Sequence, residues 1–283
     1  MRSSSLAWDL AELVRLPAAL TVPGDAWAGA SRSATGSEAS LMPVGSVLLY
    51  WSGMALNDWA DRGVDAVERP ERVIPSGRLR PDRVLLVAGL LGACGVAVTA
   101  AVGGPAALRV SVPLAALVAT YDVVAKDSAA GPFVMASTRG LDVLLGATAG
   151  DPGRAVPAAL VVAAHTYTVT ELSRREVSGG GSAALPSATL AATAGLAAAV
   201  AARGTPVTAV LAGQYLTSYG RAQARLLTDP AASTVRRAVG AGITALPALQ
   251  GALTARAGRA WIGVAVAAAA PLGRVLARKV SPT

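Results

Sequence analysis

Long apolar runs recur along the whole chain, and they constrain its fold more than any other feature. A run of about 18 or more residues, wound as an α-helix, crosses a hydrocarbon core of about 30 Å. Ten such segments can be drawn, at residues 10–30, 39–57, 83–103, 105–124, 131–149, 155–173, 184–202, 205–220, 237–254 and 260–277. Because 53% of all residues are hydrophobic and only 15% are charged, the chain lacks the polar surface of a water-facing globule. We predict an all-α, polytopic transmembrane bundle of nine to ten helices, forming one domain over residues 1–283.

The basic residues predict how the bundle lies in a cell membrane. If the N-terminus is cytoplasmic, eighteen of the 25 lysines and arginines fall at the two ends or in cytoplasmic loops, and six fall in the opposite loops. Cytoplasmic loops of membrane proteins carry such an excess of positive charge. The 58–82 loop, which together with the adjoining Arg83 carries six arginines, is therefore expected on the cytoplasmic side. This placement explains the net charge of +8 without nucleic acid, which we do not expect as a partner.

The most polar stretch of the chain follows the second apolar segment, in residues 57–77. Asn57, Asp61 and Asp65 are four residues apart, and Asp58 precedes Asp61 by three, so a helix places all four on one face. Carboxylates this close repel one another, at a cost that rises near the membrane. A divalent cation relieves the repulsion, and ligands that are all oxygen suit Mg²⁺. We call these four residues the acidic motif.

The acidic motif, together with the Arg-Pro and Ile-Pro-Ser-Gly elements that follow it, resembles the first aspartate-rich motif of the UbiA superfamily of intramembrane prenyltransferases. Supporting similarities are the Arg15-Leu-Pro opening and the element from Tyr121 to Lys126. Residues 131–146 resemble the EboC-like bacterial branch in particular. The resemblance covers about residues 12 to 255, and it implies helices arranged around a central cavity.

The second aspartate-rich motif of that family is altered in this chain. The matching region, residues 165–180, holds only two acids, Glu171 and Glu176, and has Thr166 and Ser173 where aspartates are usual. Glutamate can also bind Mg²⁺, and arginine can hold phosphate through paired hydrogen bonds, as Arg175 can here. The tenth segment has no clear counterpart in the nine-helix family pattern.

The resemblance implies ionisation of a prenyl diphosphate, with Mg²⁺ as cofactor, followed by attack of a small hydrophobic or aromatic acceptor on the carbocation. It implies three groups of site residues. The metal ligands are Asn57, Asp58, Asp61, Asp65, Glu171 and Glu176. The substrate-binding residues are Asn57, Arg72, Tyr121, Lys126 and Arg175. The catalytic residues are Asp58, Asp61 and Lys126.

Three functions fit this pattern. The first is a prenyltransferase that acts at the cytoplasmic side of the bilayer. The second is a terpene cyclase of the same superfamily, in which a double bond of the same chain is the acceptor. The third is a non-catalytic membrane carrier or complex subunit. The altered second motif favours the last two functions more than a standard second motif would.

Arg139 lies within an apolar segment, where a charged side chain needs a partner. An ion pair with Asp142, three residues on, and a contact with substrate are equally good explanations.

Overall fold

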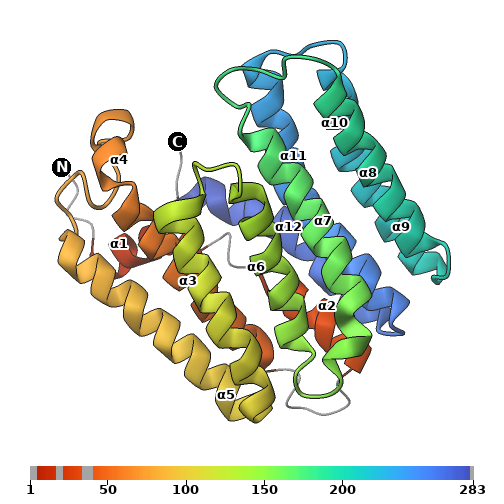
Figure 1. Ribbon diagram of the computed structural model, residues 1–283, viewed down its shortest axis with the longest axis horizontal. Helices are drawn as coiled ribbons and strands as arrows, with labels where there is room; N and C mark the ends of the chain where they lie inside the picture. The colour runs from red at the N-terminus through yellow and green to blue at the C-terminus, as the bar shows by residue number, and fades with distance from the viewer. Residues whose placement is uncertain (1–4, 17–21, 34–40, 281–283) are drawn as a thin grey trace.

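The computed structural model describes residues 5–16, 22–33 and 41–280, and the regular secondary structure of this part of the chain consists of helices, without strands (Figure 1). The α-helices are, in chain order, α1 (Leu6–Leu13), α2 (Pro23–Ser33), α3 (Met42–Ala60), α4 (Arg62–Glu68), α5 (Pro81–Thr120), α6 (Gly131–Gly146), α7 (Val156–Ser173), α8 (Ala184–Ala201), α9 (Pro206–Tyr215), α10 (Arg221–Leu226), α11 (Ala232–Arg256) and α12 (Ala260–Val280). Two π-helical turns, Tyr121–Ala125 and Leu216–Gly220, continue α5 and join α9 to α10. The predicted all-helical class is confirmed.

Most of the expected segments coincide with helices, but the first does not. The first segment divides into α1 and α2, with residues 17–21 outside the described part. The third and fourth segments form the two arms of α5, which reverses direction at Gly104, where φ is +61°. That left-handed conformation suits glycine, and Pro105 restarts the helix with its fixed φ. The tenth segment is the helix α12, which packs against α11.

Several helices are long and apolar enough to cross a membrane. Among the described residues they are the α5 region Pro81–Ala125, the α7 region Pro152–Ser173, α8 and α11. Only 22% of the most apolar stretch of Pro81–Ala125 is buried within the protein, although its mean hydropathy is 2.3. Apolar side chains that face outward to this extent need lipid around them. The chain is therefore a multi-pass membrane protein.

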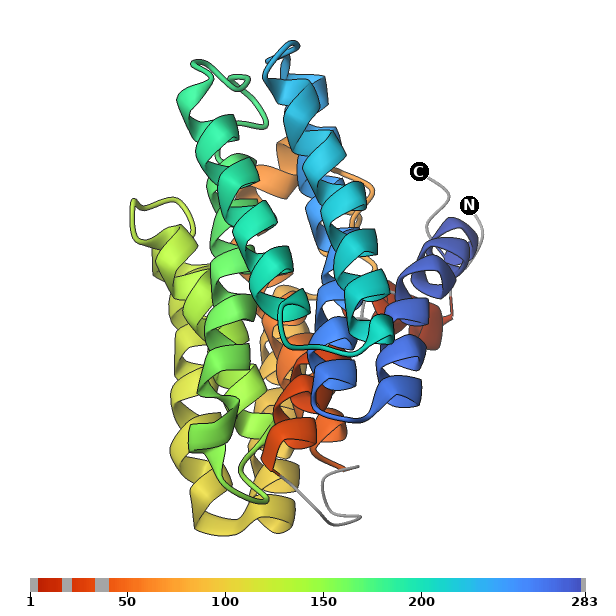
Figure 2. The ribbon, with the colours of Figure 1, turned by 90° about the vertical axis from the view of Figure 1, so that its right-hand side faces the viewer.

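The helices stand side by side, and their connections alternate between two ends of the bundle (Figures 1 and 2). α4 and the connections α5–α6, α7–α8 and α10–α11 lie at the upper end in Figure 1. The turn at Gly104 and the connections α6–α7, α8–α9 and α11–α12 lie at the opposite end. The loops that were assigned to the cytoplasm by their arginines thus share one end.

Close contact between α2 and α6 depends on glycine. A Cβ atom on Gly146 would lie 2.1 Å from the carbonyl oxygen of Ala26, and one on Gly29 would lie 1.8 Å from that of Val143. No side chain fits at either position, so the two backbones touch directly. Small residues permit such close approach, which stabilises helix pairs in lipid. This contact fixes α2 against α6, which carries Arg139 and Asp142.

Candidate active site

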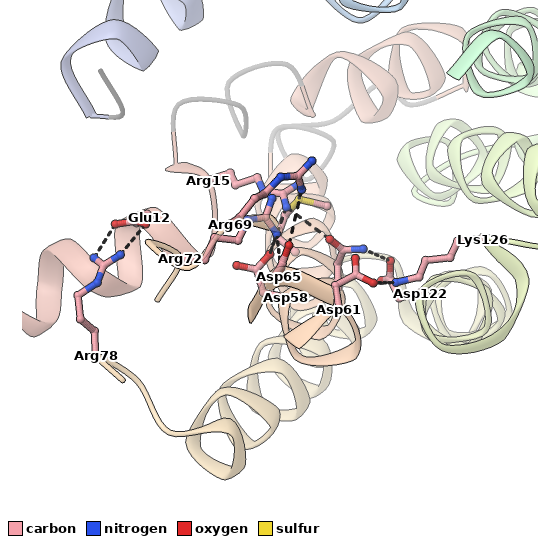
Figure 3. A network of polar contacts seen from close by, with 12 residues as sticks. Glu12, Arg15, Asp58, Asp61, Asp65, Arg69, Arg72, Arg78, Asp122 and Lys126 are labelled. Carbon is pink, nitrogen blue, oxygen red and sulfur yellow. Dashed lines mark hydrogen bonds and ion pairs between the residues drawn. The ribbon is translucent and has the colours of Figure 1, made fainter. Parts of the chain in front are cut away.

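The acidic motif turns a corner between two helices. α3 ends at Ala60, Asp61 caps it, and α4 begins at Arg62. Asp58 and Asp65 are buried, and both accept hydrogen bonds from Arg72 Nη1, at 3.0 Å and 2.9 Å. Arg72 thus bridges the two carboxylates, as Figure 3 shows. Arg72 therefore lies beside the acidic motif, and its role in binding substrate stays a prediction.

Arg15 is a member of this cluster that the sequence pattern did not assign to it. Its guanidinium pairs with Asp58 at 3.1 Å and donates a 3.4 Å hydrogen bond to the Asn57 side-chain oxygen. Its backbone has φ +49°, a conformation that is uncommon and strained for a residue with a side chain. Such strain persists where surrounding contacts hold it, and here the contacts are polar groups of the acidic motif.

Asp61 faces away from Arg72 and pairs with Lys126, on the other side of the motif (Figure 3). Lys126 follows the π-helical turn Tyr121–Ala125, in which the Lys126 backbone N–H donates to the Tyr121 carbonyl at 2.9 Å. The wider turn brings these two residues, five apart in sequence, onto one face of the helix. The same turn presents Asp122, whose carboxylate accepts a 3.4 Å hydrogen bond from Asn57. Asp122 belongs to the Tyr121–Lys126 element, but its contact with the acidic motif was missed, because no sequence spacing links the two.

The altered second motif forms a polar pocket of about 600 Å³ beside Lys126. We call it the basic pocket; its lining residues are Tyr121, Lys126, Asp127, Glu171, Ser173, Arg174 and Arg175. Thr166, the other position where the family usually has aspartate, is buried and donates its hydroxyl to the Val162 carbonyl of its own helix. The structure therefore brings Glu171 and Arg175 to the same pocket as Lys126 and Tyr121, and their roles stay predictions.

Glu176 does not line the basic pocket. Its backbone carbonyl accepts a hydrogen bond from Arg236 on α11, and partial burial raises the pKa of its carboxyl, although Arg236 and Arg69 oppose the shift. The two acids of the second motif therefore occupy different surroundings.

An apolar cavity of about 150 Å³ lies beside Asp122, the residue that accepts a hydrogen bond from Asn57 of the acidic motif. α3, α5 and α6 supply most of its walls, including Leu49, Gly53, Leu114, Val118 and Met135. Tyr121 lines both this cavity and the basic pocket, and Asp122 lines the cavity. A molecule with a charged head and an apolar tail would find matching surroundings on the two sides of Tyr121.

The segment between α4 and α5 is held over the acidic motif by a second ion-pair group. Arg78 donates to both carboxylate oxygens of Glu12, at 2.7 Å and 2.8 Å, and to Asp9 at 2.8 Å. Its bonds to Glu12, and then to Asp9, raise the pKa of Arg78 above its ordinary value. Paired hydrogen bonds between charged groups are the strong ones. They tie α1 to the segment that carries Arg72.

The oxygen ligands of the acidic motif fit an Mg²⁺ ion that is also bound by substrate phosphate. Within the described residues, no three Asp, Glu, His or Cys side chains are gathered closely enough to hold a metal ion by themselves. The carboxylates are instead neutralised by Arg15, Arg72 and Lys126. Mg²⁺ is usually bound through one or two carboxylates together with substrate phosphates. The residues therefore suit a metal ion whose coordination is completed by a diphosphate.

These features define a class: a helical membrane protein whose apolar cavity opens beside a cluster of carboxylates, arginines and a lysine. The chain belongs to the UbiA prenyltransferase family, whose model matches residues 17–280.

Solved structures of similar fold agree with this assignment. An apo UbiA homolog from Aeropyrum pernix K1 has a TM-score of 0.66 and 18% identity, covering 83% of this chain and 96% of that one. A structure that concerns digeranylgeranylglyceryl phosphate synthase in membranes has a TM-score of 0.64 and 16% identity, covering 88% and 97%. At these identities the likeness shows the fold.

Curated relatives match over shorter stretches. Digeranylgeranylglyceryl phosphate synthase of Natronomonas pharaonis is 33% identical over 106 residues, 38% of this chain and 38% of that protein. The enzyme of the same name from Methanothrix thermoacetophila is 45% identical over 53 residues, 18% of this chain and 20% of that protein. The matched segments thus span less than half of these relatives. They do not address the EboC-like branch, which stays a prediction.

Proposed function

We propose that this protein transfers a prenyl group from a prenyl diphosphate to a small acceptor within the membrane, with Mg²⁺ as cofactor. The observation that carries the proposal is the junction at Tyr121 between the basic pocket and the apolar cavity, directly beside the acidic motif. A prenyl diphosphate has the same two parts, a highly charged head and a hydrocarbon tail. The curated relatives, named as digeranylgeranylglyceryl phosphate synthases, support the same reaction class.

The charged residues would act on the head group. Lys126, Arg175 and Arg72 would hold phosphate oxygens by charge-assisted hydrogen bonds and stabilise the negative charge that develops as diphosphate departs. Mg²⁺ bound at Asn57, Asp58, Asp61 and Asp65 would supply further positive charge to the leaving group. Glu171 lines the basic pocket and would be the contribution of the second motif to metal binding, whereas Glu176 lies outside that pocket.

The cavity would act on the carbocation. Its aliphatic walls exclude water, which would otherwise capture the cation before the acceptor does. The ring of Tyr121 lies where the two pockets meet, and an aromatic face attracts a cation. The acceptor would then attack the cation within the same enclosed space.

The domain organisation and the orientation in the membrane are also part of the proposal. Residues 1–283 would form one membrane-embedded domain, with the N-terminus and the diphosphate site on the cytoplasmic side. The motivation is the clustering of the arginine-rich connections at the end of the bundle that carries the acidic motif. Membership of the EboC-like branch is proposed only on the resemblance of residues 131–146.

The test is incubation of the purified protein with prenyl diphosphates of increasing chain length and Mg²⁺, with and without candidate acceptors. Pyrophosphate release that requires an acceptor and yields a prenylated product supports the proposal. Release without acceptor, together with a volatile hydrocarbon, would instead identify a terpene cyclase. Binding of the diphosphate without release under any condition would identify a carrier.

A further inference from the structure

The outer face of the run from α9 to α10 changes in polarity along its length. α8, α9 and α10 form the edge of the bundle at the right of Figure 1 and face the viewer in Figure 2. Val210 on α9 is 69% exposed. The next exposed positions along the run include polar ones, which we call the outer polar face: Thr217 and Ser218 in the π-helical turn, and Arg221 and Arg225 on α10. Residues 218, 221 and 225 follow one another at intervals of three and four, so they share one side of the helix.

The two arginines of this face carry charges that the described part of the chain does not neutralise. Neither Arg221 nor Arg225 makes an ion pair or a side-chain hydrogen bond with a described residue. α10 packs against α8 and α11, and residues 177–256, which include all three helices, contain a single acidic residue, Asp229. Asp229 pairs with Arg237 at the start of α11, at 3.7 Å. Two positive charges therefore remain available to an anion.

The position of these charges along the helix matches the depth of lipid headgroups. α9, the π-helical turn and α10 form one continuous run, about 30 Å long at 1.5 Å per residue. The hydrocarbon core of a bilayer has about the same thickness, so the end of α10 lies near the boundary of the core. Arginine side chains near such a boundary extend their charged ends to the headgroups.

The order of groups along the face also matches one phospholipid molecule. An apolar side chain, Val210, is followed by two hydroxyl groups and then by two guanidinium groups. A phospholipid presents, in the same direction, an acyl chain, ester oxygens and a phosphate. Hydroxyl groups can donate to ester oxygens, and guanidinium groups bind phosphate by charge-assisted hydrogen bonds.

A second copy of the chain fits this face less well than a lipid does. In a two-fold dimer the same surface meets itself. Arg221 and Arg225 would then face the same two arginines of the other copy, with no acidic residue of α8, α9 or α10 to separate them. Basic residues next to a membrane span instead attract anionic lipids.

We propose that the outer polar face binds an anionic phospholipid, with the phosphate at Arg221 and Arg225 and an acyl chain along Val210. In the orientation proposed above, this lipid belongs to the cytoplasmic leaflet. The site is separate from the basic pocket, because none of these residues lines that pocket. The lipid preference does not depend on the proposed function.

The test uses a fluorescent label beside the two arginines. Ala224 is exposed on α10 and Cys94 is the one cysteine of the sequence, so Ala224→Cys in a Cys94→Ser background carries bimane at a single position. The protein is reconstituted in phosphatidylcholine liposomes that also contain spin-labelled phosphatidylglycerol or spin-labelled phosphatidylcholine, with the nitroxide near the top of one acyl chain. The quenching of bimane, measured against the mole fraction of each spin-labelled lipid, gives the relative affinity of the site for the two headgroups.

We expect phosphatidylglycerol to bind about 20-fold more tightly than phosphatidylcholine. Each basic residue near the membrane surface contributes about fivefold in affinity for an anionic lipid, and two residues act here. Salt at about 1 M should reduce the preference, because exposed charges are screened. Arg221→Gln and Arg225→Gln should each lower the preference about fivefold, and the double variant should remove it.

Two matched controls separate the site from general charge and polarity. Arg203→Gln also removes one exposed positive charge, but from the connection that precedes α9, at the opposite end of the same run. Gln214→Leu removes an exposed polar side chain about 10 Å deeper than Arg221, below the headgroups. Both variants should keep the preference of the wild type.

Equal quenching by the two lipids in the wild type would overturn the inference, and so would an equal loss of preference in Arg203→Gln and Arg221→Gln. A second copy seated on the face would shield bimane from both lipids, and dilution of the protein in the bilayer would then increase quenching by both. That result would replace the lipid with a dimer contact. The assay contains no prenyl diphosphate, so its failure is distinguishable from a failure of the proposed function, which pyrophosphate release measures.

Discussion

Replacement of Lys126 should change the affinities for metal ion and for diphosphate in opposite directions. In the structure its ammonium group pairs with Asp61, and under the proposed function it also binds the diphosphate. Replacing Lys126 with Met removes both interactions. The Asp61 carboxylate is then released to a metal ion, while the diphosphate loses a cationic partner. We therefore expect the variant to bind metal more tightly and diphosphate more weakly than the wild type.

The size of the change follows from the exposure of the pair. The side chains of Lys126 and Asp61 are 19% and 29% exposed, so the pair lies between a surface ion pair and a buried one. A hydrogen bond between such groups contributes about 1.5 kcal/mol, which corresponds to about tenfold in affinity. We expect about a tenfold gain in Mn²⁺ affinity without diphosphate, and a loss of at least about tenfold in affinity for a non-reactive prenyl diphosphate analogue.

The assay is titration of Mn²⁺ into detergent-solubilised protein, followed by the electron paramagnetic resonance signal of free Mn²⁺. Arg174→Met is the matched control, because Arg174 lines the same basic pocket but donates to the Ser128 carbonyl and not to a carboxylate. It should weaken binding of the diphosphate analogue without a comparable gain in Mn²⁺ affinity. Unchanged or weaker Mn²⁺ binding by Lys126→Met, or an equal gain in Mn²⁺ affinity in Arg174→Met, would refute the inference that Lys126 and a metal ion compete for the Asp61 carboxylate.

Three further changes test the fold, the second motif and the orientation. Gly146→Ala should lower the free energy of unfolding by about 2 kcal/mol, because its Cβ would lie 2.1 Å from a carbonyl oxygen of α2. The thermal midpoint in detergent should fall accordingly. Gly213→Ala, where a Cβ meets open space, should leave the thermal midpoint unchanged. Glu176→Gln should slow Mg²⁺-dependent diphosphate release less than Asp58→Asn, and equal damage would place Glu176 in the metal site. A cysteine at Ser76 in a cysteine-free background should react with impermeant thiol reagents only after cell lysis, and labelling of intact cells would reverse the orientation.

The helices could be predicted from sequence because their apolar character is local. A run of apolar residues is visible without knowledge of its neighbours, and the reversal at Gly104 was expected between two such runs. The division of the first segment into α1 and α2 was not expected, although Pro17 and the Pro23-Gly24 pair interrupt its apolar pattern. The bounds of α12 were close to those predicted, although its position against α11 depends on packing that no sequence period reveals.

The candidate site could be predicted only where its residues are neighbours in sequence. The acidic motif and the Tyr121–Lys126 element were found for that reason. Arg15 and Asp122 were missed as parts of the cluster, since Arg15 reaches it from the turn after α1 and Asp122 from the π-helical turn after α5. Arg139 shows the same limit: Asp142 was its nearest acid on a helix, but the close packing of α2 and α6 brings Asp25 to it instead.

The account depends most on the acidic motif as the centre at which the diphosphate is held and released. The direct measurement is pyrophosphate release by the purified protein in proteoliposomes, with Mg²⁺ and with EDTA, in the wild type, Asp61→Asn and Asp82→Asn. Asp82 is an exposed carboxylate that pairs only with Arg80 among the described residues, so it controls for the loss of one negative charge. We predict release by the wild type and Asp82→Asn only with Mg²⁺, and a loss of at least about 100-fold in Asp61→Asn. Release by Asp61→Asn at the wild-type rate, or in EDTA, would contradict the account.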